Sequence, residues 1–451
     1  MLNRIINALT QEKGCKTIPN NGALLLKGGK MDKTIVKGNE LLADKYVKVR
    51  RQTTKLCSPL LAEDYVVQPV TDVSPPKWHL GHTTWFFETF VLSRFNKDYK
   101  HFNPAFNYIF NSYYESIGDR VLRTQRGNLT RPGIEEIYNY REYVDGQVTQ
   151  LLESYTNPEL SYLLELGLQH EQQHQELLLT DIKYILGHNP LFPVYQQSII
   201  KSGSTTSNRG LDFIDIPEGI YEIGYRGTDF SFDNEKPVHK AYVNGFSIAD
   251  RLITNKEYLE FMMDGGYKNF RFWLAEGWDM VKLQNWEAPF YWMQKEGEWQ
   301  EYTLAGLAKV NPELPVTHIS FFEADAYANW AGKRLLGEAE WEVATRLIGV
   351  KSEKSNFLES GCYHTTAAQE DTNQLFGDAW EWTYSAYHPY PGYSKAEGAL
   401  GEYNGKFMIN QIILRGGSCA TPKDHIRESY RNFFHPDKRW QFTGIRLADK
   451  V

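Results

Sequence analysis

The stretch Leu160-Ser-Tyr-Leu-Leu-Glu-Leu-Gly-Leu-Gln-His170-Glu-Gln-Gln-His174 decides the fold of the first half of this chain. Its leucines recur at helical spacing, and the pattern continues until Gly187 and Pro190 end it. Because His174 follows His170 by four residues, the two imidazoles share one helix face, with their Cβ atoms roughly 5–6 Å apart. This spacing is suited to two ligands of one metal ion.

The string H-E-x-x-H in this helix also matches the zinc-protease pattern, in which the glutamate, here Glu171, acts as general base. A metzincin would carry glycine at position 177 and histidine at position 180, but Leu177 and Thr180 occupy them. That branch is excluded, whereas a zinc hydrolase with a third ligand on another helix stays open. The polar run from Glu171 to Glu176 must either be exposed or be satisfied around a site.

The composition is that of an ordinary globular protein, with 451 residues, 41% of them hydrophobic and 23% charged. This length predicts two to three domains. A formal charge of −7 argues against general nucleic-acid binding, and no apolar stretch approaches a membrane span. Cys15, Cys57, Cys362 and Cys419 lie far apart without a C-x-x-C pair. This pattern predicts neither a disulfide framework nor a cysteine zinc site, and it fits a reducing cytoplasm.

Helical patterns fill residues 36–200, and residues 1–35 before them are predicted to be a flexible leader. Ser74-Pro75-Pro76 predicts the start of one helix, because proline favours the first turn. A further helix is expected from about Glu135 to Leu152. Together with the histidine helix, these segments predict an antiparallel four-helix bundle, a scaffold that commonly builds metal sites from facing helices.

A polar Gly/Ser linker at residues 201–210 then predicts a domain boundary. Residues 211–451 are dense in glycine and aromatic residues, with short strand-like pieces and only two expected helices, near 255–263 and 321–332. This half of the chain is predicted to be an irregular α+β domain held together by buried aromatic side chains.

The third ligand of the metal site is expected on the helix that follows Pro76. His82 falls on one stripe of that helix with Trp78 and Trp85, whereas His79 lies off the stripe and is expected outside the site. Three imidazoles leave coordination positions open for substrates. Neutral nitrogen ligands suit iron, zinc or copper alike, so the spacing leaves the metal open.

Several motifs resemble a known family. In the first half, the following stretches resemble the DinB-type domain of ergothioneine-biosynthesis sulfoxide synthases: Ser74-Pro-Pro-Lys-Trp-His-Leu-Gly-His82, Ser112-Tyr-Tyr-Glu115, Gln125-Arg-Gly127 and His170-Glu-Gln-Gln-His174. In the second half, similarity to the formylglycine-generating-enzyme (sulfatase-modifying factor) fold is carried by Gly332-Lys-Arg-Leu-Leu-Gly-Glu-Ala-Glu-Trp341, Gly377-Asp-Ala-Trp-Glu-Trp382 and Leu414-Arg-Gly-Gly-Ser418.

The resemblance implies a DinB-like four-helix bundle followed by a C-type-lectin-like, formylglycine-generating-enzyme-type α+β domain. It implies a non-haem Fe(II) oxidoreductase ligated by His82, His170 and His174. Such an enzyme uses O₂ to join the sulfur of cysteine to C2 of hercynine (N-alpha-trimethylhistidine) with S-oxidation. Formylglycine-generating enzymes use a cysteine pair at the positions of Thr421 and Ile426, so their own chemistry is not expected here.

The resemblance also implies the substrate-binding and catalytic residues. Candidates for holding hercynine are Gln173, Asn432 and the aromatic rings of Phe433 and Phe434, since a quaternary ammonium is bound by aromatic faces. Candidates for the cysteine carboxylate are Arg123 and Arg126, and candidates for a proton donor are Tyr113 and Tyr114.

The identity of residue 434, a phenylalanine, helps to predict which sulfur donor the enzyme uses. Relatives that use γ-glutamylcysteine carry an acid at the position of Phe434, and its absence here, with Tyr113 and Tyr114 present, favours the branch that uses free cysteine. A γ-glutamylcysteine-using enzyme and a selenoneine synthase remain the alternatives within the family. The H-E-x-x-H zinc hydrolase and a non-catalytic binding module remain the alternatives outside it.

Overall fold

The computed structural model describes residues 33–155, 157–197, 209–349, 353–369, 373–395, 401–402 and 404–450. Most of the predicted leader, residues 1–35, therefore lies outside the described residues, and its last three residues begin helix α2 (Lys33–Cys57). The predicted linker, residues 201–210, also lies outside the described residues apart from Arg209 and Gly210.

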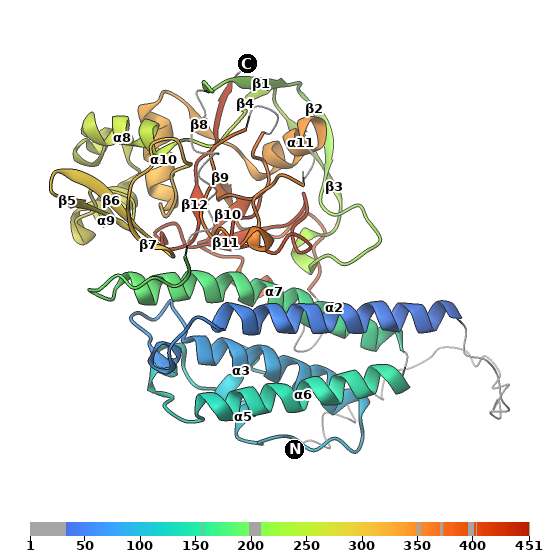
Figure 1. Cartoon of the computed structure of the whole chain (residues 1–451). Helices are drawn as coiled ribbons and strands as arrows, with labels where there is room; N and C mark the ends of the chain where they lie inside the picture. Colours follow the sequence, from blue (N-terminus) through green and yellow to red (C-terminus); the bar gives the residue numbers. More distant parts are fainter. Residues whose placement is uncertain are drawn as a thin grey trace.

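The first half of the chain forms the expected bundle of antiparallel helices (Figure 1). Its long members are α2, α3 (Pro76–Phe87), α6 (Ile134–Ser154) and α7 (Pro158–Gly187). Shorter elements connect them, namely 3₁₀ turns at Ala62–Val66 and Arg123–Asn128, a π turn at Glu88–Leu92, and the helices α4 (Ser93–Phe95) and α5 (Phe106–Phe110).

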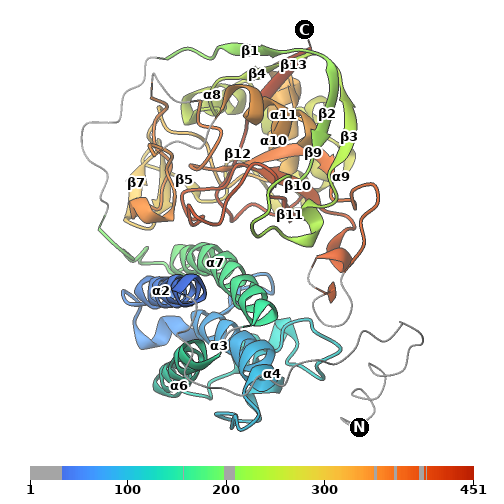
Figure 2. The same cartoon turned by 90° about the vertical axis from the view of Figure 1, so that its right-hand side faces the viewer.

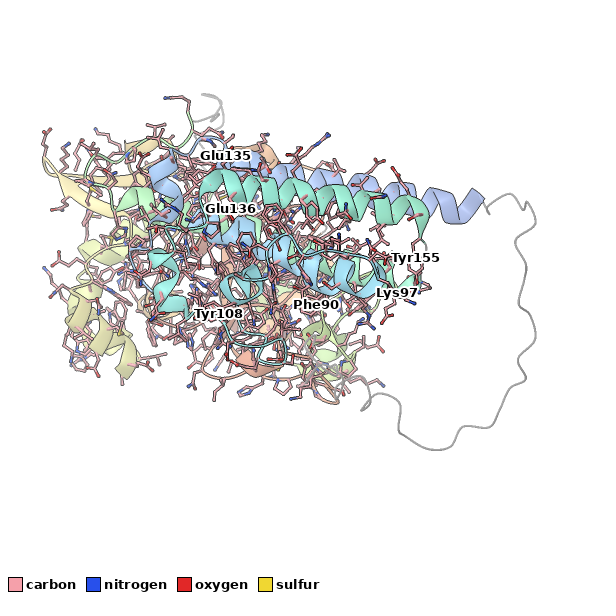
Figure 3. The ribbon with its side chains drawn as sticks, turned by 90° about the horizontal axis from the view of Figure 1, so that it is seen from below. Phe90, Lys97, Tyr108, Glu135, Glu136 and Tyr155 are labelled. Carbon is pink, nitrogen blue, oxygen red and sulfur yellow. The ribbon has the colours of Figure 1, made fainter. Side chains whose placement is uncertain are left out.

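Local sequence explains where these helices begin. Pro76 is the first residue of α3, as the double proline predicts. The side chain of Asn157 accepts hydrogen bonds from the first backbone N–H groups of α7, which caps that helix. Glu135 and Glu136 lie in the first turn of α6, where negative charge complements the helix dipole, and Tyr155 follows its last turn (Figure 3).

The second domain is built from four helices and thirteen strands within the described residues. The helices are α8 (Asn255–Met263), α9 (Ala275–Gln284), α10 (Phe321–Trp330) and α11 (Glu338–Ile348). The strands are β1 (Phe213–Ile216), β2 (Gly219–Ile223), β3 (His239–Val243), β4 (Phe246–Ala249), β5 (Trp292–Lys295), β6 (Glu298–Thr303), β7 (Gly306–Lys309), β8 (Arg334–Leu335), β9 (Trp380–Ala386), β10 (Ile412–Arg415), β11 (Asn432–Phe434), β12 (Thr443–Gly444) and β13 (Leu447–Lys450).

These strands form several small sheets rather than one large one. Two four-stranded sheets have the orders β1-β4-β13-β8 and β11-β10-β9-β12, and β2-β3 and β5-β6-β7 form two further sheets. All pairs are antiparallel except β12 with β9. Strand β11 and the sheet β5-β6-β7 both lie on the side of the second domain that faces the bundle (Figure 1), so β11 is placed to contribute to a site between the domains.

The prediction of only two helices in the second domain is wrong, because α9 and α11 were missed. Helix α9 buries little of its surface, so its apolar periodicity is weak. Helix α11 buries its middle, residues 341–345, and this buried stretch includes Glu342, which pairs with the buried Arg415 at 3.2 Å. A charged residue among the buried positions is not anticipated by apolar spacing alone.

Helix α7 is the element shared by the two domains. It lies with α2 on the side of the bundle that faces the second domain, whereas α3 and α6 are farther away (Figures 1 and 2). The segment after α7 contacts both domains. The Tyr195 hydroxyl donates to the backbone carbonyl of Leu56 in the bundle at 2.6 Å, and the backbone N–H of Tyr195 donates to the carbonyl of Leu304 in the second domain at 3.0 Å. The position of α7 therefore determines how the domains meet.

Two glycines inside helices test the packing of the bundle. A Cβ added at Gly167 in α7 would lie 2.5 Å from the ring of Phe87 and 3.0 Å from that of Phe86, and both rings are fully buried. A Cβ added at Gly146 in α6 would contact nothing within 4 Å. We expect Gly167→Ala to lower the free energy of unfolding by about 1–3 kcal/mol. Gly146→Ala should raise it by about 0.5–1 kcal/mol. Urea unfolding measures both, and shifts of the same sign would contradict the described packing of α7 against α3.

Candidate metal centre

Three histidine side chains converge between α3 and α7. One ring nitrogen from each of His82, His170 and His174 lies within 4.8 Å of the others, and all three side chains are buried. Nε2 of His82 and Nε2 of His170 are 3.2 Å apart. The structure therefore brings together the three histidines that the sequence predicts as ligands, two from α7 and one from α3.

The ring of His82 is held in one orientation. Its Nδ1 donates to the backbone carbonyl of Phe110 at 2.6 Å, which leaves Nε2 without a proton. Trp78 stacks on the imidazole with 4.5 Å between centroids, and Trp85 stacks at 5.6 Å. A ligand fixed in this way loses little conformational freedom when a metal binds.

His79 is not one of the three converging histidines, as expected, but it points inward and contacts His174, which corrects the expectation that it points away from the site. Its side chain is buried, with Nδ1 at 2.9 Å from Nδ1 of His174 and Nε2 at 3.0 Å from the carboxylate of Asp181. Asp181 also accepts the backbone N–H of Ser74 at 2.8 Å. Asp181, His79 and His174 thus form a hydrogen-bonded row. The row orients the His174 ring through its Nδ1.

The donor set fits one metal ion. Burial lowers the pKa of His82 and His174 well below the ordinary value and that of His170 to about 3, so all three imidazoles are neutral at pH 7. Neutral imidazole is the form that binds metals. His82, His170 and His174 would hold the ion, and three protein ligands would leave positions for small molecules.

Glu171 points away from the three histidines into a buried ion-pair network. Its carboxylate accepts from Arg50 Nη1 at 2.9 Å, from Thr53 Oγ1 at 2.6 Å and from Arg141 Nη2. Burial raises the pKa of this carboxyl, but Arg141 and Arg50 outweigh burial and hold the pKa at about 2. A carboxylate committed to two guanidinium groups cannot serve as the general base of a zinc protease, so its role is structural.

The face of α7 that carries Glu176 contacts the second domain. Glu176 accepts hydrogen bonds from Trp380 Nε1 at 2.6 Å, Ser418 Oγ at 2.6 Å and Thr421 Oγ1 at 2.8 Å. Thr421 occupies a position where formylglycine-generating enzymes carry a cysteine. Here its hydroxyl donates to Glu176 of the bundle. Cys419 is fully buried, as expected for a small structural residue.

The two candidate arginines occupy different environments. Arg126 is buried, with its guanidinium 3.3 Å from the centroid of the Trp78 ring and its Nη1 donating to Ser74 Oγ at 2.9 Å. Arg123 is exposed, and its Nη2 donates to the backbone carbonyl of Asp72 at 2.5 Å. Since Trp78 also stacks on His82, Arg126 is the arginine adjacent to the metal centre.

The two candidate tyrosines lie side by side, with 4.7 Å between their ring centroids. Tyr114 is fully buried and packs against Trp85 at 5.7 Å, whereas Tyr113 packs against Phe407 of the second domain at 5.3 Å. Burial raises the pKa of Tyr113 above its ordinary value, so this phenol stays protonated at neutral pH.

The candidates for holding hercynine come from β11 and α7. Asn432, Phe433 and Phe434 form β11 and are partly exposed, and Phe433 stacks on Tyr387 with 4.0 Å between centroids. Gln173 on α7 donates from Nε2 to the Tyr430 hydroxyl at 2.7 Å. Strand β11 lies on the side of the second domain that faces α7 (Figures 1 and 2), and the hydrogen bonds of Gln173 and Glu176 connect the same two domains.

Residues that sequence reasoning missed include His79, Asp181, Tyr430 and His425. His79 precedes His82 by three residues, so the two side chains are neighbours on the helix surface, and this i, i+3 spacing is the sequence signal for its proximity. Asp181 lies seven residues after His174, two turns along the same helix face. No sequence signal points to Tyr430 or His425, because their partners are on another domain.

A helical bundle with a buried three-histidine centre, joined to a sulfatase-modifying-factor type of domain, defines a class of metalloenzyme. The family model of the Sulfatase-modifying factor enzyme 1-like domain matches residues 200–372 and 352–451, and that of the DinB superfamily matches residues 45–178. The chain belongs to the ergothioneine-biosynthesis sulfoxide synthase family, whose characterised relatives are named hercynine oxygenases, and it is accordingly an oxidoreductase.

Individual relatives match over most of the chain. It is 28% identical to the hercynine oxygenase of Mycolicibacterium smegmatis, over 91% of this chain and 98% of that protein. It is 30% identical to the hercynine oxygenase of Mycobacterium tuberculosis, over 64% of this chain and 71% of that protein. The ergothioneine biosynthesis protein 1 of Schizosaccharomyces pombe is 26% identical over 54% of this chain and 30% of its own length. In the described part of the chain, no helix has both the length and the apolar character needed to cross a membrane.

The row from Asp181 through His79 to His174 predicts a role for His79 in metal affinity. We expect His79→Ala to weaken Fe(II) binding roughly 10- to 100-fold, because His174 loses the group that orients it. His82→Ala removes a ligand and should weaken binding further. Anaerobic Fe(II) titration against a competing chelator measures both, with the exposed His188→Ala as control. An unchanged affinity in His79→Ala would contradict this role.

The Glu171 network predicts a stability effect without a catalytic one. Glu171→Gln leaves the buried Arg141 without a carboxylate and leaves Arg50 with Asp145 alone, so the variant should lose about 3–5 kcal/mol of stability at pH 7. Because the pKa is lowered on folding from 4.5 to about 2, the ion-pair contribution is complete above pH ~4.5 and disappears as pH falls toward 2. Urea unfolding against pH measures this, with the exposed Glu153→Gln as control. A difference between wild type and variant that grows on acidification would contradict it.

Proposed function

We propose that this protein is a non-haem Fe(II), O₂-dependent sulfoxide synthase that joins the sulfur of free cysteine to C2 of the imidazole of hercynine. The reaction breaks the S–H bond and the C2–H bond and forms a C–S bond and an S=O bond. O₂ accepts four electrons, with one oxygen atom entering the sulfoxide and the other leaving as water. The convergence of His82, His170 and His174, in a chain of this family, is the observation that carries the proposal.

The oxygenase class favours iron at the three histidines. Zinc has no redox chemistry, so it cannot mediate reduction of O₂. Iron(II) bound there would supply the redox chemistry with O₂ and open positions for a thiol and an imidazole. The row that holds His174 through His79 and the Phe110 carbonyl that holds His82 keep the ligands in place while substrates bind.

Arg126 is our candidate for binding the cysteine carboxylate, in preference to Arg123. Within the described residues, Arg126 forms no ion pair, although burial lowers its pKa well below the ordinary value. A buried guanidinium without an anion is costly, and a bound carboxylate would relieve that cost through two parallel hydrogen bonds. Arg123 is exposed and already donates to a backbone carbonyl.

Asn432, Phe433 and Gln173 are our candidates for binding hercynine. The partly exposed aromatic rings of β11 offer faces to a trimethylammonium group, which has no hydrogen-bond donor. Phe434 packs against Trp440 with 6.3 Å between centroids and carries no charge, so it offers nothing to a γ-glutamyl ammonium group. This apolar contact supports free cysteine as the sulfur donor.

Tyr113 and Tyr114 are our candidates for delivering a proton during O₂ reduction. Tyr114 packs against Trp85, which stacks on His82, and Tyr113, whose raised pKa keeps it protonated, lies between Tyr114 and Phe407 of the second domain. The free thiols of Cys57, Cys362 and Cys419 agree with a reducing compartment such as the cytoplasm.

The proposal predicts a defined product. Protein loaded anaerobically with Fe(II), then given O₂, hercynine and cysteine, should form the cysteine sulfoxide adduct of hercynine with one O₂ consumed per product. Mass spectrometry and an oxygen electrode measure this. Arg126→Met should raise the KM for cysteine roughly 10- to 100-fold, because a charge-assisted hydrogen bond is lost, while Arg123→Met leaves it nearly unchanged.

Two outcomes would count against the proposal. Bound zinc without any iron-dependent oxygen uptake would contradict the oxygenase assignment. A preference for γ-glutamylcysteine over cysteine would leave the oxygenase in place and contradict the inference drawn from Phe434.

A further inference from the structure

A chain of buried hydrogen bonds joins the metal-bearing helix to the second domain. On α7, Gln169 Oε1 lies 2.7 Å from Nδ1 of His425, whose Nε2 lies 2.9 Å from the hydroxyl of Tyr430. Nε2 of Gln173, one helical turn after Gln169, lies 2.7 Å from the same hydroxyl. The side chains of Gln169, His425 and Tyr430 are at most 5% exposed, so this series of hydrogen bonds is shielded from water.

The direction of every hydrogen bond in this chain follows from its first member. Gln169 donates its amide Nε2 to the carboxylate of Glu165 at 2.7 Å, so its Oε1 faces His425 and can only accept. Nδ1 of His425 therefore carries the ring proton. Burial and the neighbouring Arg427 lower the pKa of His425 well below its ordinary value, in agreement with a single ring proton.

The protonation of His425 also determines which atom of Gln173 faces Tyr430. Since Nδ1 of His425 holds the proton, its Nε2 must accept, and the Tyr430 hydroxyl donates to it. That hydroxyl has no second proton, so toward Gln173 it can only accept. The Gln173 atom that faces Tyr430 is thus the amide nitrogen, and the carbonyl oxygen occupies the other side of the amide.

We propose that Tyr430, held by His425, is a positioning residue that presents the carbonyl oxygen of Gln173, rather than its N–H group, to hercynine. The proposal rests on the proposed function, in which Gln173 contacts the betaine. Gln173 lies between the two histidines of α7, three residues after His170 and one before His174. A carbonyl oxygen attracts a trimethylammonium group or a ring N–H and repels a carboxylate. The cationic part of hercynine therefore lies at Gln173, and its carboxylate lies elsewhere.

A double-mutant cycle tests whether Tyr430 acts through Gln173. Tyr430→Phe removes only the hydroxyl, and we expect it to weaken hercynine binding to the anaerobic Fe(II)-loaded protein roughly 3- to 10-fold, as measured by calorimetry. In a Gln173→Leu background, the same change should have no further effect. Equal effects of Tyr430→Phe in both backgrounds would overturn the positioning role. Tyr258→Phe, a buried hydroxyl in α8 bonded to Tyr267, is the control and should leave hercynine affinity unchanged.

An isosteric change tests which atom of Gln173 faces the substrate. Gln173→Glu keeps an acceptor toward hercynine and adds negative charge there, but it also replaces the N–H that faces Tyr430. Hercynine affinity should therefore fall by no more than the roughly 3- to 10-fold expected for Tyr430→Phe, or increase. If Gln173 donated its N–H to the hercynine carboxylate, the new like charge would weaken binding more than roughly 100-fold, and that result would overturn the proposal. Wild-type protein that binds no hercynine would instead overturn the proposed function itself, so the two failures are distinguishable.

Discussion

The buried pairing of Glu171 with two arginines sets the position of α7, and α7 in turn positions the candidate site. Arg50 comes from α2 and Arg141 from α6, and both reach Glu171 in the middle of α7. Arg50 also donates to Thr84 on α3 at 3.0 Å, so four helices meet at one carboxylate. Because a buried charge without its partner costs several kcal/mol, this arrangement specifies the rotation and the height of α7 in the bundle.

The rotation of α7 decides what each of its faces does. With Glu171 directed toward α2 and α6, His170 and His174 are directed toward α3 and meet His82. The remaining face carries Gln173 and Glu176 to the second domain. One rigid helix thus sets the distance between a metal centre and the aromatic residues of another domain, and a precise site is better held by a helix than by loops.

The second domain contributes surface residues to the junction with the bundle, and it lacks the cysteine pair that formylglycine-generating enzymes use. Where formylglycine-generating enzymes have a cysteine, Thr421 donates to Glu176 of the bundle. The same region supplies Tyr430 and β11, which face α7. The fold has therefore been used as a partner surface for the bundle, in keeping with the general observation that function belongs to sites and not to folds.

Local sequence patterns predict the bundle, the convergence of His82, His170 and His174 and the α+β character of the second half, because each of these depends on local periodicity, on prolines and caps, or on motifs that are contiguous in the chain. Only the tertiary structure decided the role of Glu171, the inclusion of His79 and the difference between Arg123 and Arg126. These depend on which distant groups lie nearby: two guanidinium groups for Glu171, His174 and Asp181 for His79, and Trp78 for Arg126. Helix α11 escaped prediction for the same reason, since the partner that makes Glu342 a buried residue is Arg415, seventy-three positions away.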